Sequence, residues 1–251
     1  MPHKFETGIR GSKDDERIIG GESANIQDYP YQVSMRWTYG VPKPTHFCGG
    51  AIVSKNHIVT AAHCVEDKMS PSSLKYMKIY AGTSRSDTVG QGNVYNVKKI
   101  TIHPSYRGSS NTYLNDIAII TVNEPIVFNE YQQKVQLPSK DVQTGVEAVI
   151  TGWGLTHPSY NQLAKQLQKT SSRLVASSQC QRKFPLALRN IQVCAVQKRG
   201  VGVCSGDSGG PLVSNGTLVG IASFVIECGK GYPDVYTNVF PHSEFLKSTI
   251  F

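Results

Sequence analysis

The sequence predicts an all-β protein, and two observations lead to this class. Short apolar or alternating runs recur along the 251 residues at fairly regular spacing, which is typical of barrels or of a sandwich. Turn residues separate the runs, and the 23 Gly and 13 Pro are spread along the whole chain. Hydrophobic residues make up 39% and charged residues 18%, which argues against a disordered chain.

The expected strands are short, and one helix is expected at the end of the chain. A run that alternates apolar and polar residues indicates a half-buried strand, whereas the continuous apolar run after Asp116 indicates a strand buried on both faces. Residues 241–250 read as a helix that opens with Pro241. In chain order, the expected strands are 31–37, 51–54, 75–80, 93–100, 116–122, 147–150, 166–175, 211–214, 218–225 and 234–239.

The apolar runs are too short to cross a membrane, and the positive charge is dispersed. No apolar run approaches the ~20 residues that a bilayer requires. The net charge of +8 brings nucleic acid and heparin-like polymers into consideration. The basic residues form pairs, as at 98–99 and 182–183, without long runs or an RNA-binding aromatic motif. We therefore expect a solvated basic surface and neither nucleic acid nor membrane as a partner, with polyanion binding kept as an alternative that is compatible with catalysis.

The cysteines predict disulfides and an oxidising compartment. The chain has six Cys and no C-x-x-C pair, which points to three disulfides instead of a zinc knuckle or a redox motif. We expect a secreted, extracellular protein. The first residues contain no apolar signal-peptide core, so we expect a signal to have been removed and some of these residues to be foreign to the natural chain.

The strongest chemical signal is the segment Cys204-Ser-Gly-Asp-Ser-Gly-Gly-Pro211. A serine hydroxyl needs a base within hydrogen-bonding reach before it acts as a nucleophile. Gly206 and Gly209 flank Ser208 and permit a sharp turn, in which the N–H groups of Gly206 and Ser208 point toward one developing oxyanion. A tight turn without catalytic meaning is the alternative for this segment alone.

His63 and Asp116 supply the partners that this serine needs. His63 lies in Thr60-Ala-Ala-His-Cys64, just after an apolar run, where a disulfide at Cys64 would make the base rigid. By itself such a histidine is more often structural. Asp116 opens a strongly apolar strand, where an unpaired carboxylate would be costly. We expect Asp116 to fix the tautomer of His63, and His63 to take the proton of Ser208.

With these three segments in the order His, Asp, Ser, residues 18–251 resemble the chymotrypsin family of serine endopeptidases. Thr151-Gly-Trp-Gly154 and Gly220-Ile-Ala-Ser-Phe224 also match the family. The resemblance implies two six-stranded antiparallel β-barrels with a C-terminal α-helix, divided into residues 18–130 and 131–251, with the active site between them. It also implies that Ser223 bonds near Asp116, that residues 223–225 pair with the substrate backbone, and that no cofactor or metal is needed. The implied disulfides are Cys48–Cys64, Cys180–Cys194 and Cys204–Cys228.

The same resemblance interprets the first 17 residues as an activation propeptide. Asp14-Asp-Glu-Arg17 followed by Ile18-Ile-Gly-Gly21 looks like an acidic propeptide that ends in a trypsin-type cleavage site. Cleavage after Arg17 would free the Ile18 amine, which in the family pairs with the residue at Asp207. A buried ammonium and carboxylate are tolerable only as a pair, so the oxyanion hole should be malformed before cleavage. No Cys precedes Arg17, so the propeptide should leave.

Substrate preference follows from the residues that match the family's specificity pocket. Gly202 stands at the pocket base where trypsins have Asp, and Val225 stands where trypsin and chymotrypsin have Gly and should narrow the pocket. Asp234 opposes this apolar pattern, and crab collagenases and some insect relatives pair an uncharged base with such an Asp. Its carboxylate either receives Arg or Lys, or is held by neighbouring hydrogen bonds and only shrinks the pocket. We expect apolar P1 residues, with acceptance of basic P1 residues as the alternative. The expected pocket residues are Gly202, Val203, Ser205, Ser223, Phe224, Val225 and Asp234.

The expected function is therefore a secreted endopeptidase made as a zymogen and similar to arthropod chymotrypsins, elastases and collagenases. The expected partners are protein or peptide substrates, a trypsin-like activating protease, and serpins or small protein inhibitors, for a monomeric enzyme. A protein of this family that has lost catalysis and only binds partners is the alternative from another class. Only Asp87 in residues 84–93 could serve a calcium loop, so calcium is not expected. Asn215-Gly-Thr217 reads either as a glycosylation site or as a hairpin turn.

Overall fold

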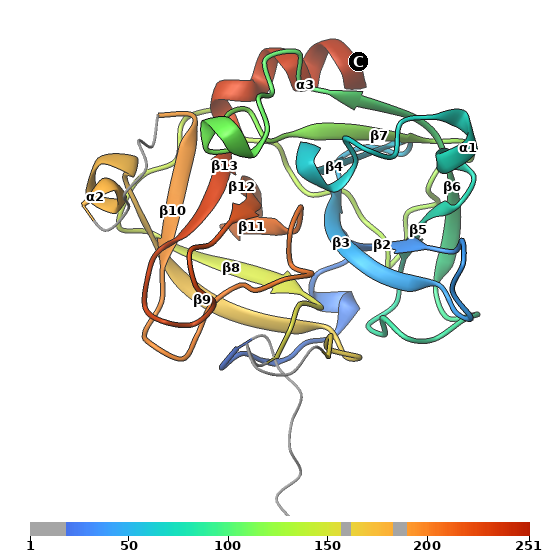
Figure 1. The fold of residues 1–251 in the computed structure, drawn as a ribbon, viewed down its shortest axis with the longest axis horizontal. Coiled ribbons are helices and arrows are strands. Elements are labelled where there is room, and N and C mark those ends of the chain that lie inside the picture. Colours follow the sequence, from blue (N-terminus) through green and yellow to red (C-terminus); the bar gives the residue numbers. More distant parts are fainter. Residues whose placement is uncertain (1–18, 157–161, 183–189) are drawn as a thin grey trace, which may run out of the picture.

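Two antiparallel β-barrels lie side by side in the computed structural model, which describes residues 19–156, 162–182 and 190–251 (Figure 1). The first barrel is closed in the strand order β2-β3-β4-β7-β6-β5. Its strands are β2 (Gln32–Trp37), β3 (Thr45–Ile52), β4 (His57–Thr60), β5 (Met77–Ala81), β6 (Asn93–Ile102) and β7 (Ala118–Val122).

The second barrel has the strand order β8-β9-β10-β13-β12-β11, and pairing of β8 with both β9 and β11 closes it. Its strands are β8 (Glu147–Gly152), β9 (Gln168–Val175), β10 (Gln192–Val196), β11 (Pro211–Ser214), β12 (Thr217–Phe224) and β13 (Asp234–Asn238). The expected fold class is confirmed: two six-stranded antiparallel barrels are followed by a C-terminal helix.

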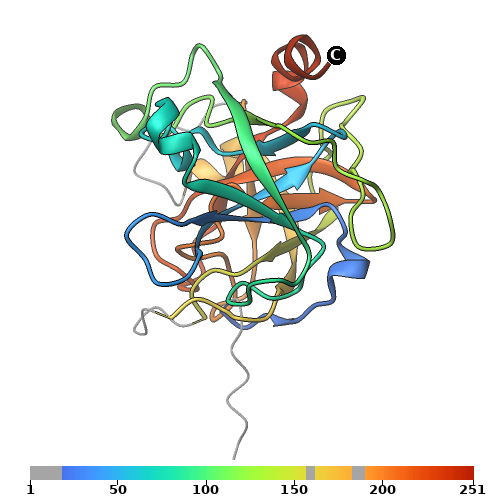
Figure 2. The same cartoon turned by 90° about the vertical axis from the view of Figure 1, so that its right-hand side faces the viewer.

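Each end of the described chain crosses to the other barrel. The short strand β1 (Glu22–Ser23) precedes the first barrel in sequence but pairs with β9 of the second. The helix α3 (Ser243–Ile250) follows a 3₁₀ turn, η4 (Phe240–His242), and packs on the first barrel (Figures 1 and 2). Leu246 is its anchor, since this side chain is 1% exposed within the first barrel's core. Strand pairing holds the first crossing, and burial of apolar surface around Leu246 holds the second.

Three disulfides tie functional segments to the barrels. Cys48–Cys64 joins β3 to the 3₁₀ turn η2 (Ala62–Cys64), Cys180–Cys194 joins α2 (Ser177–Gln181) to β10, and Cys204–Cys228 joins the loops before β11 and after β12. These are the pairings that the resemblance implies. Each closes a loop of 14 to 24 residues, for which chain entropy predicts a stabilisation of about 3 kcal/mol.

Several elements differ from the expectation. Strand β3 begins six residues before Ala51, because Gly50 lets β3 approach Val33 and Ile58 where a Cβ would crowd both. Strand β10 was not expected, and neither were α1 (Pro71–Leu74), α2 and the 3₁₀ turns η1 (Ile26–Asp28) and η3 (Ser109–Asn111), which are too short to show a helical period. Asn215 and Gly216 form the two-residue turn between β11 and β12, both with positive φ. In the described residues, no helix is both long and apolar enough to span a membrane.

Candidate active site

His63 and Asp116 face each other at the junction of the two barrels. His63 sits in η2, directly after β4, and the disulfide at Cys64 fixes this turn. Its Nδ1 lies 2.8 Å from Asp116 Oδ2, and its backbone N–H donates to Asp116 Oδ1 at 2.9 Å. The carboxylate only accepts, so the Nδ1 of His63 carries the proton and Nε2 is left as the acceptor.

Asp116 is fully buried, and both barrels contribute its partners. Ser223 Oγ on β12 donates to Asp116 Oδ2 at 2.6 Å, and Thr237 Oγ1 on β13 donates to the Asp116 backbone carbonyl at 2.8 Å. The carboxylate therefore accepts three hydrogen bonds, which offsets the cost of burying it. Asp116 precedes β7 by two residues, so it lies just before the start of that buried strand and not within it.

The loop that carries Ser208 is docked between the barrels. The Gly49 N–H of β3 donates to the Ser208 carbonyl at 2.8 Å, and the Gly209 N–H donates to the Ala222 carbonyl of β12 at 2.8 Å. Gly209 has φ of +74°, and a Cβ there would overlap Thr60 Oγ1. Glycine is therefore required at this position for both conformation and space.

Two backbone N–H groups of the loop that carries Ser208 have no acceptor in the part of the chain that the structure describes. Among the described residues, no hydrogen bond is donated by the N–H of Gly206 or of Ser208. In the same part of the chain, no hydrogen bond joins Ser208 Oγ to His63 Nε2. Such bonds are often long without substrate and tighten in the reacting complex. The site thus offers a hydroxyl, an acceptor nitrogen and two unpaired donors.

Asp207 explains the Gly-Trp-Gly motif. Its buried carboxylate accepts from the Gly154 N–H at 2.7 Å and from the Cys204 N–H at 3.0 Å. A Cβ at Gly152 or Gly154 would overlap this carboxylate, so both positions need glycine. Burial raises the pKa of Asp207 to about 6, and the two backbone donors only partly offset this. Arg17 and Ile18, the expected cleavage site and the expected partner of Asp207, lie outside the described residues.

A cavity of about 100 Å³ adjoins Ser208, and we call it the Ser208 cavity. Five of the seven expected pocket residues line it. Its walls consist of Val203, Cys204, Ser205, Ser208, Ala222, Ser223, Phe224 and Val225. Gly202 and Asp234 do not line it.

Asp234 lies behind the wall of the Ser208 cavity. Its side chain is 2% exposed, and its Oδ2 accepts from the Val203 N–H at 3.0 Å. Its carboxylate also lies next to Gly202. Burial raises the pKa of Asp234 to about 7, while the Val203 N–H and the Gln197 side chain counteract this in part. The carboxylate is thus held by a neighbouring hydrogen bond, which is one of the two arrangements that the sequence leaves open for it.

Asp234 predicts a pH dependence of stability. The folded state disfavours the charged form of Asp234. The contribution of Asp234 to the free energy of unfolding is therefore fully present below the unfolded pKa of about 3.9, and it is lost as pH rises through the folded pKa of about 7. Asp234→Asn keeps an acceptor for Val203 and has no charge. We expect this variant to lose less unfolding free energy between pH 4 and 8, by on the order of 2 kcal/mol in urea titrations. Asp87→Asn, at an exposed ion pair, is the control, and equal pH slopes for Asp234→Asn and wild type would contradict the assignment.

The sequence interpretation missed one aromatic residue of the site, Tyr113. The Tyr113 ring lies 5.5 Å from the His63 ring and 5.6 Å from Phe224, measured between centroids. Thr112, Tyr113 and Asn115 all have φ between 52° and 57°, a left-handed conformation that costs non-glycine residues energy. Nothing in the local sequence marks Tyr113 as part of the site.

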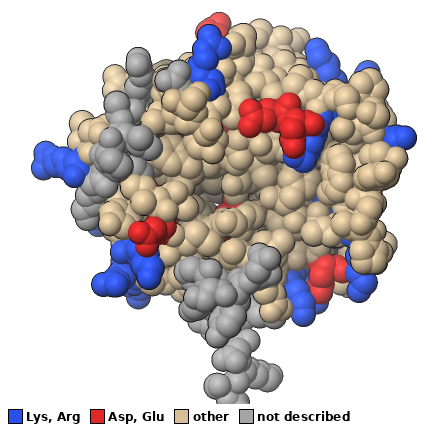
Figure 3. Space-filling view, in the orientation of Figure 1, with Lys and Arg blue, Asp and Glu red and all other residues tan. Residues whose placement is uncertain are grey.

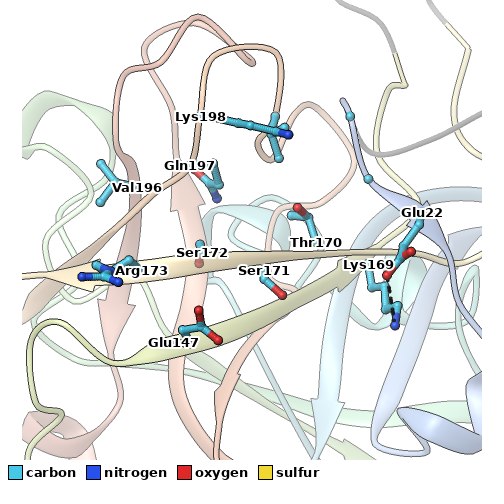
Figure 4. A pocket seen from close by; sticks show the side chains of 13 residues that line it. Glu22, Glu147, Lys169, Thr170, Ser171, Ser172, Arg173, Val196, Gln197 and Lys198 are labelled. Atoms are coloured by element: carbon cyan, nitrogen blue, oxygen red, sulfur yellow. Dashed lines mark ion pairs between the residues drawn. The ribbon is translucent and has the colours of Figure 1, made fainter.

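A larger cavity lies away from Ser208. It measures about 530 Å³ and is bounded by β9, the start of β1 and the segment after β10 (Figure 4). Its walls are polar, and an ion pair of 3.2 Å between Lys169 and Glu22 crosses one end. Neither Ser208 nor His63 lines it. Its size therefore does not make it the reaction site.

Charge and metal ligands give little support to other functions. Lys and Arg side chains are scattered around the face shown in Figure 3 and do not gather in one patch. Within the described ranges, the one group of potential metal ligands is Cys48, His63 and Cys64. Both sulfurs belong to a disulfide, which leaves no thiolate to bind a metal.

The comparisons with known proteins agree with this geometry. Residues 18–246 match the family described as Trypsin. The chain is 36% identical over 231 residues to Chymotrypsin-2 of Vespa crabro, covering 92% of this chain and 98% of the relative. It is 34% identical to Trypsin I-P1 of Gallus gallus, covering 95% and 91%, and 35% identical to Trypsin delta of Drosophila melanogaster, covering 90% and 85%.

The chain belongs to the trypsin family of serine proteases with the chymotrypsin fold. It is a serine endopeptidase, a hydrolase that acts on proteins, and this class confirms the expectation from the sequence. The relatives named above include both trypsins and a chymotrypsin, so the preferred P1 residue is a separate question. The three disulfides are consistent with an extracellular protein.

Proposed function

We propose that Ser208 is the nucleophile, His63 the base and then the acid, and Asp116 the residue that orients His63. One observation carries this assignment: the buried Asp116 holds His63 Nδ1 at 2.8 Å, which directs the acceptor Nε2 away from the carboxylate. The free N–H groups of Gly206 and Ser208 form the oxyanion hole. In the protein cleaved after Arg17, these donors bind the charge that develops on the substrate oxygen.

In the first half of the reaction, Ser208 Oγ attacks the scissile carbonyl carbon while His63 Nε2 takes the hydroxyl proton. The oxygen of the tetrahedral intermediate is bound by the two N–H groups. His63 then gives the proton to the leaving amine as the C–N bond breaks, which leaves an ester on Ser208. Water repeats the sequence with His63 as base, releasing the acid and restoring the hydroxyl.

We further propose that the protein is a secreted zymogen, with residues 1–17 as its propeptide and 18–130 and 131–251 as its two domains. Asp207 supports this, because its carboxylate is fully buried and forms no ion pair with any described residue. The Ile18 amine, freed by cleavage after Arg17, would supply the missing charge. The activator is a trypsin-like protease, because the bond to be cut follows arginine. The enzyme acts as a monomer and is open to serpins and small protein inhibitors.

The proposed P1 preference is for small and medium apolar side chains. An apolar cavity of about 150 Å³ holds a benzene ring, and the Ser208 cavity is smaller, at about 100 Å³. Val203 and Val225 make its wall apolar, and Asp234 is held behind that wall. Ala, Val and Leu fit this space, whereas an Arg side chain would meet no charge on the cavity surface. Basic P1 residues require Asp234 to turn, and acceptance of them is the second candidate specificity.

A P1 profile on a mixed peptide library tests both proposals. Intact protein is compared with protein cleaved after Arg17 and freed of the activator. We expect hydrolysis to rise about 10²- to 10³-fold on cleavage, the scale of losing an oxyanion donor, with Ala, Val and Leu preferred. Equal activity of the two forms would contradict the zymogen proposal. Dominant cleavage after Arg or Lys, abolished in Asp234→Asn, would replace the apolar preference.

Val225→Gly should change the preferred P1 residue. Removing the isopropyl group enlarges the Ser208 cavity at its wall, so kcat/KM for Phe and Tyr should rise about 10- to 100-fold relative to Ala. Kinetics on matched peptides that differ only at P1 measure this ratio. Val89→Gly, at an exposed valine of a surface loop, is the control. An unchanged Phe to Ala ratio in Val225→Gly would show that Val225 does not limit the cavity.

A further inference from the structure

We propose that Arg36 is a positioning residue for the oxyanion hole: through Ser34 it fixes the tautomer of His46, and His46 holds the carbonyl of Gly206. The four groups form one buried chain of hydrogen bonds. Arg36 Nε donates to Ser34 Oγ at 3.1 Å, Ser34 Oγ lies 2.8 Å from His46 Nδ1, and His46 Nε2 lies 2.9 Å from the Gly206 carbonyl oxygen. This inference rests on the proposed function, because the group positioned is the Gly206 N–H.

Only one direction from donor to acceptor is possible along this chain of hydrogen bonds. A carbonyl oxygen accepts only, so Nε2 of His46 must carry the proton that reaches Gly206. Burial lowers the pKa of His46 to about 4, so the ring is neutral at pH 7 and its Nδ1 must accept. Ser34 therefore donates its single proton to Nδ1 and is left as an acceptor, which Arg36 satisfies.

Arg36 prevents the reverse direction. A guanidinium has no acceptor, so Ser34 has nowhere along the chain to send its proton except His46. In the other tautomer, the bare Nε2 would face the Gly206 oxygen, and two lone pairs would repel each other. Both ends of the chain thus select the same tautomer, one by accepting only and the other by donating only.

Among the described residues, Arg36 is kept in place by hydrogen bonds and a ring contact and forms no ion pair. It is fully buried, and its other nitrogens donate to the carbonyls of Thr88 at 2.8 Å and Arg85 at 2.5 Å. Its Cζ lies 3.8 Å from the centre of the Tyr80 ring, a distance suited to a cation–π contact. Burial lowers the pKa of Arg36 to about 10, so it is charged and remains a donor at pH 7.

The strand geometry places these residues together. Ser34 and Arg36 are two apart on β2, so both leave the same face, opposite the core residues Val33 and Met35. Arg36 pairs in register with His46 on β3. The run Gln32-Val-Ser-Met-Arg-Trp37 looks like a half-exposed strand, but its polar residues are also buried.

The far end of this chain of hydrogen bonds holds the peptide unit that follows the Gly206 N–H. The Gly206 carbonyl and the Asp207 N–H belong to one peptide unit. His46 binds its oxygen, and the Cys204 carbonyl accepts from its nitrogen at 3.0 Å. Gly206 has φ of +97° and no side chain to restrain it, so these two bonds limit its rotation. Losing the first would free Gly206 and misdirect its N–H.

The test is a double-mutant cycle with Ser34→Ala, Arg36→Met and the double variant, all cleaved after Arg17. If Arg36 acts through Ser34, each single change lowers kcat about tenfold with little change in KM, and the second change adds nothing. Additive losses would show that Arg36 only supports the Arg85–Thr88 loop, and would overturn the proposal. Arg85→Met is the matched control, because its side chain pairs with Asp87 on the surface.

Nitrogen NMR of the histidine rings supplies a readout that does not depend on turnover. Wild-type His46, assigned by its loss in His46→Gln, should be the Nε2–H tautomer. In Arg36→Met, only the Gly206 carbonyl still selects the tautomer, so a fraction of the Nδ1–H form should appear. A pure Nε2–H form in Arg36→Met would contradict the proposed role of Arg36. If the enzyme proves inactive while the tautomer changes as expected, the proposed function fails, and the link from Arg36 through Ser34 to His46 stands.

Discussion

Ser208→Ala should lower kcat on a peptide substrate about 10⁶-fold at pH 8 in the protein cleaved after Arg17. Without Oγ no ester forms, and only water attack assisted by the two N–H donors remains. The fold should be unaffected, because the loop is held through the Ser208 carbonyl and the Gly209 N–H, which the substitution leaves in place. Equal melting temperatures together with lost turnover would separate chemistry from folding.

Ser205→Ala is the matched control for this change. It removes a hydroxyl from the same cavity wall, three residues before Ser208, and should retain activity within about tenfold. If Ser208→Ala kept more than a few per cent of wild-type turnover, with contaminating protease excluded by an inhibitor titration, another group would be the nucleophile. The triad proposal would then be wrong.

Asp116→Asn should lower kcat about 10⁴-fold and leave the fold intact. Asp116 Oδ2 accepts from both His63 Nδ1 and Ser223 Oγ. An amide nitrogen at this point presents a donor, so His63 must accept at Nδ1 and carry its proton at Nε2. It can then no longer take the proton of Ser208. Ser223 remains satisfied, since a hydroxyl can accept from the new amide.

The pH profile distinguishes the wrong tautomer from a general disturbance. The variant should regain rate as pH rises and hydroxide or alkoxide replaces base catalysis, whereas a distorted site would stay slow. Asp67→Asn, at a carboxylate paired with Lys68 on the surface, is the control and should behave as wild type. A loss of less than tenfold for Asp116→Asn would show that Asp116 does not set the His63 tautomer.

The sequence predicts much of the fold because buried strands leave a readable period. The alternation at 93–100 and the apolar run after Asp116 correspond to β6 and β7. The sequence does not reveal β10, whose residues are buried on both faces over only five positions. The start of β3 is hidden for another reason, since Gly49 and Gly50 look like turn residues but permit close packing between strands. Such packing depends on distant segments, which no local pattern contains.

The residues of the site also fall into those that the sequence predicts and those that it does not. Ser208, His63 and Asp116 could be proposed from their local segments because their chemistry needs unusual neighbours. Tyr113 and the Ser34–His46 link could not, because their roles arise only when separate loops meet. For Asp234 the sequence leaves two arrangements open, and only the packed structure places its carboxylate behind Val203, where it accepts a backbone N–H.

Covalent trapping tests the central proposal, that Ser208 forms an acyl-enzyme, most directly. The protein cleaved after Arg17 is treated with a serine-directed organophosphonate, and its intact mass and peptide masses are measured. We expect one adduct per chain, on Ser208, absent from Ser208→Ala and strongly slowed in His63→Ala. An adduct on another residue, or none while the same sample hydrolyses peptides, would contradict it.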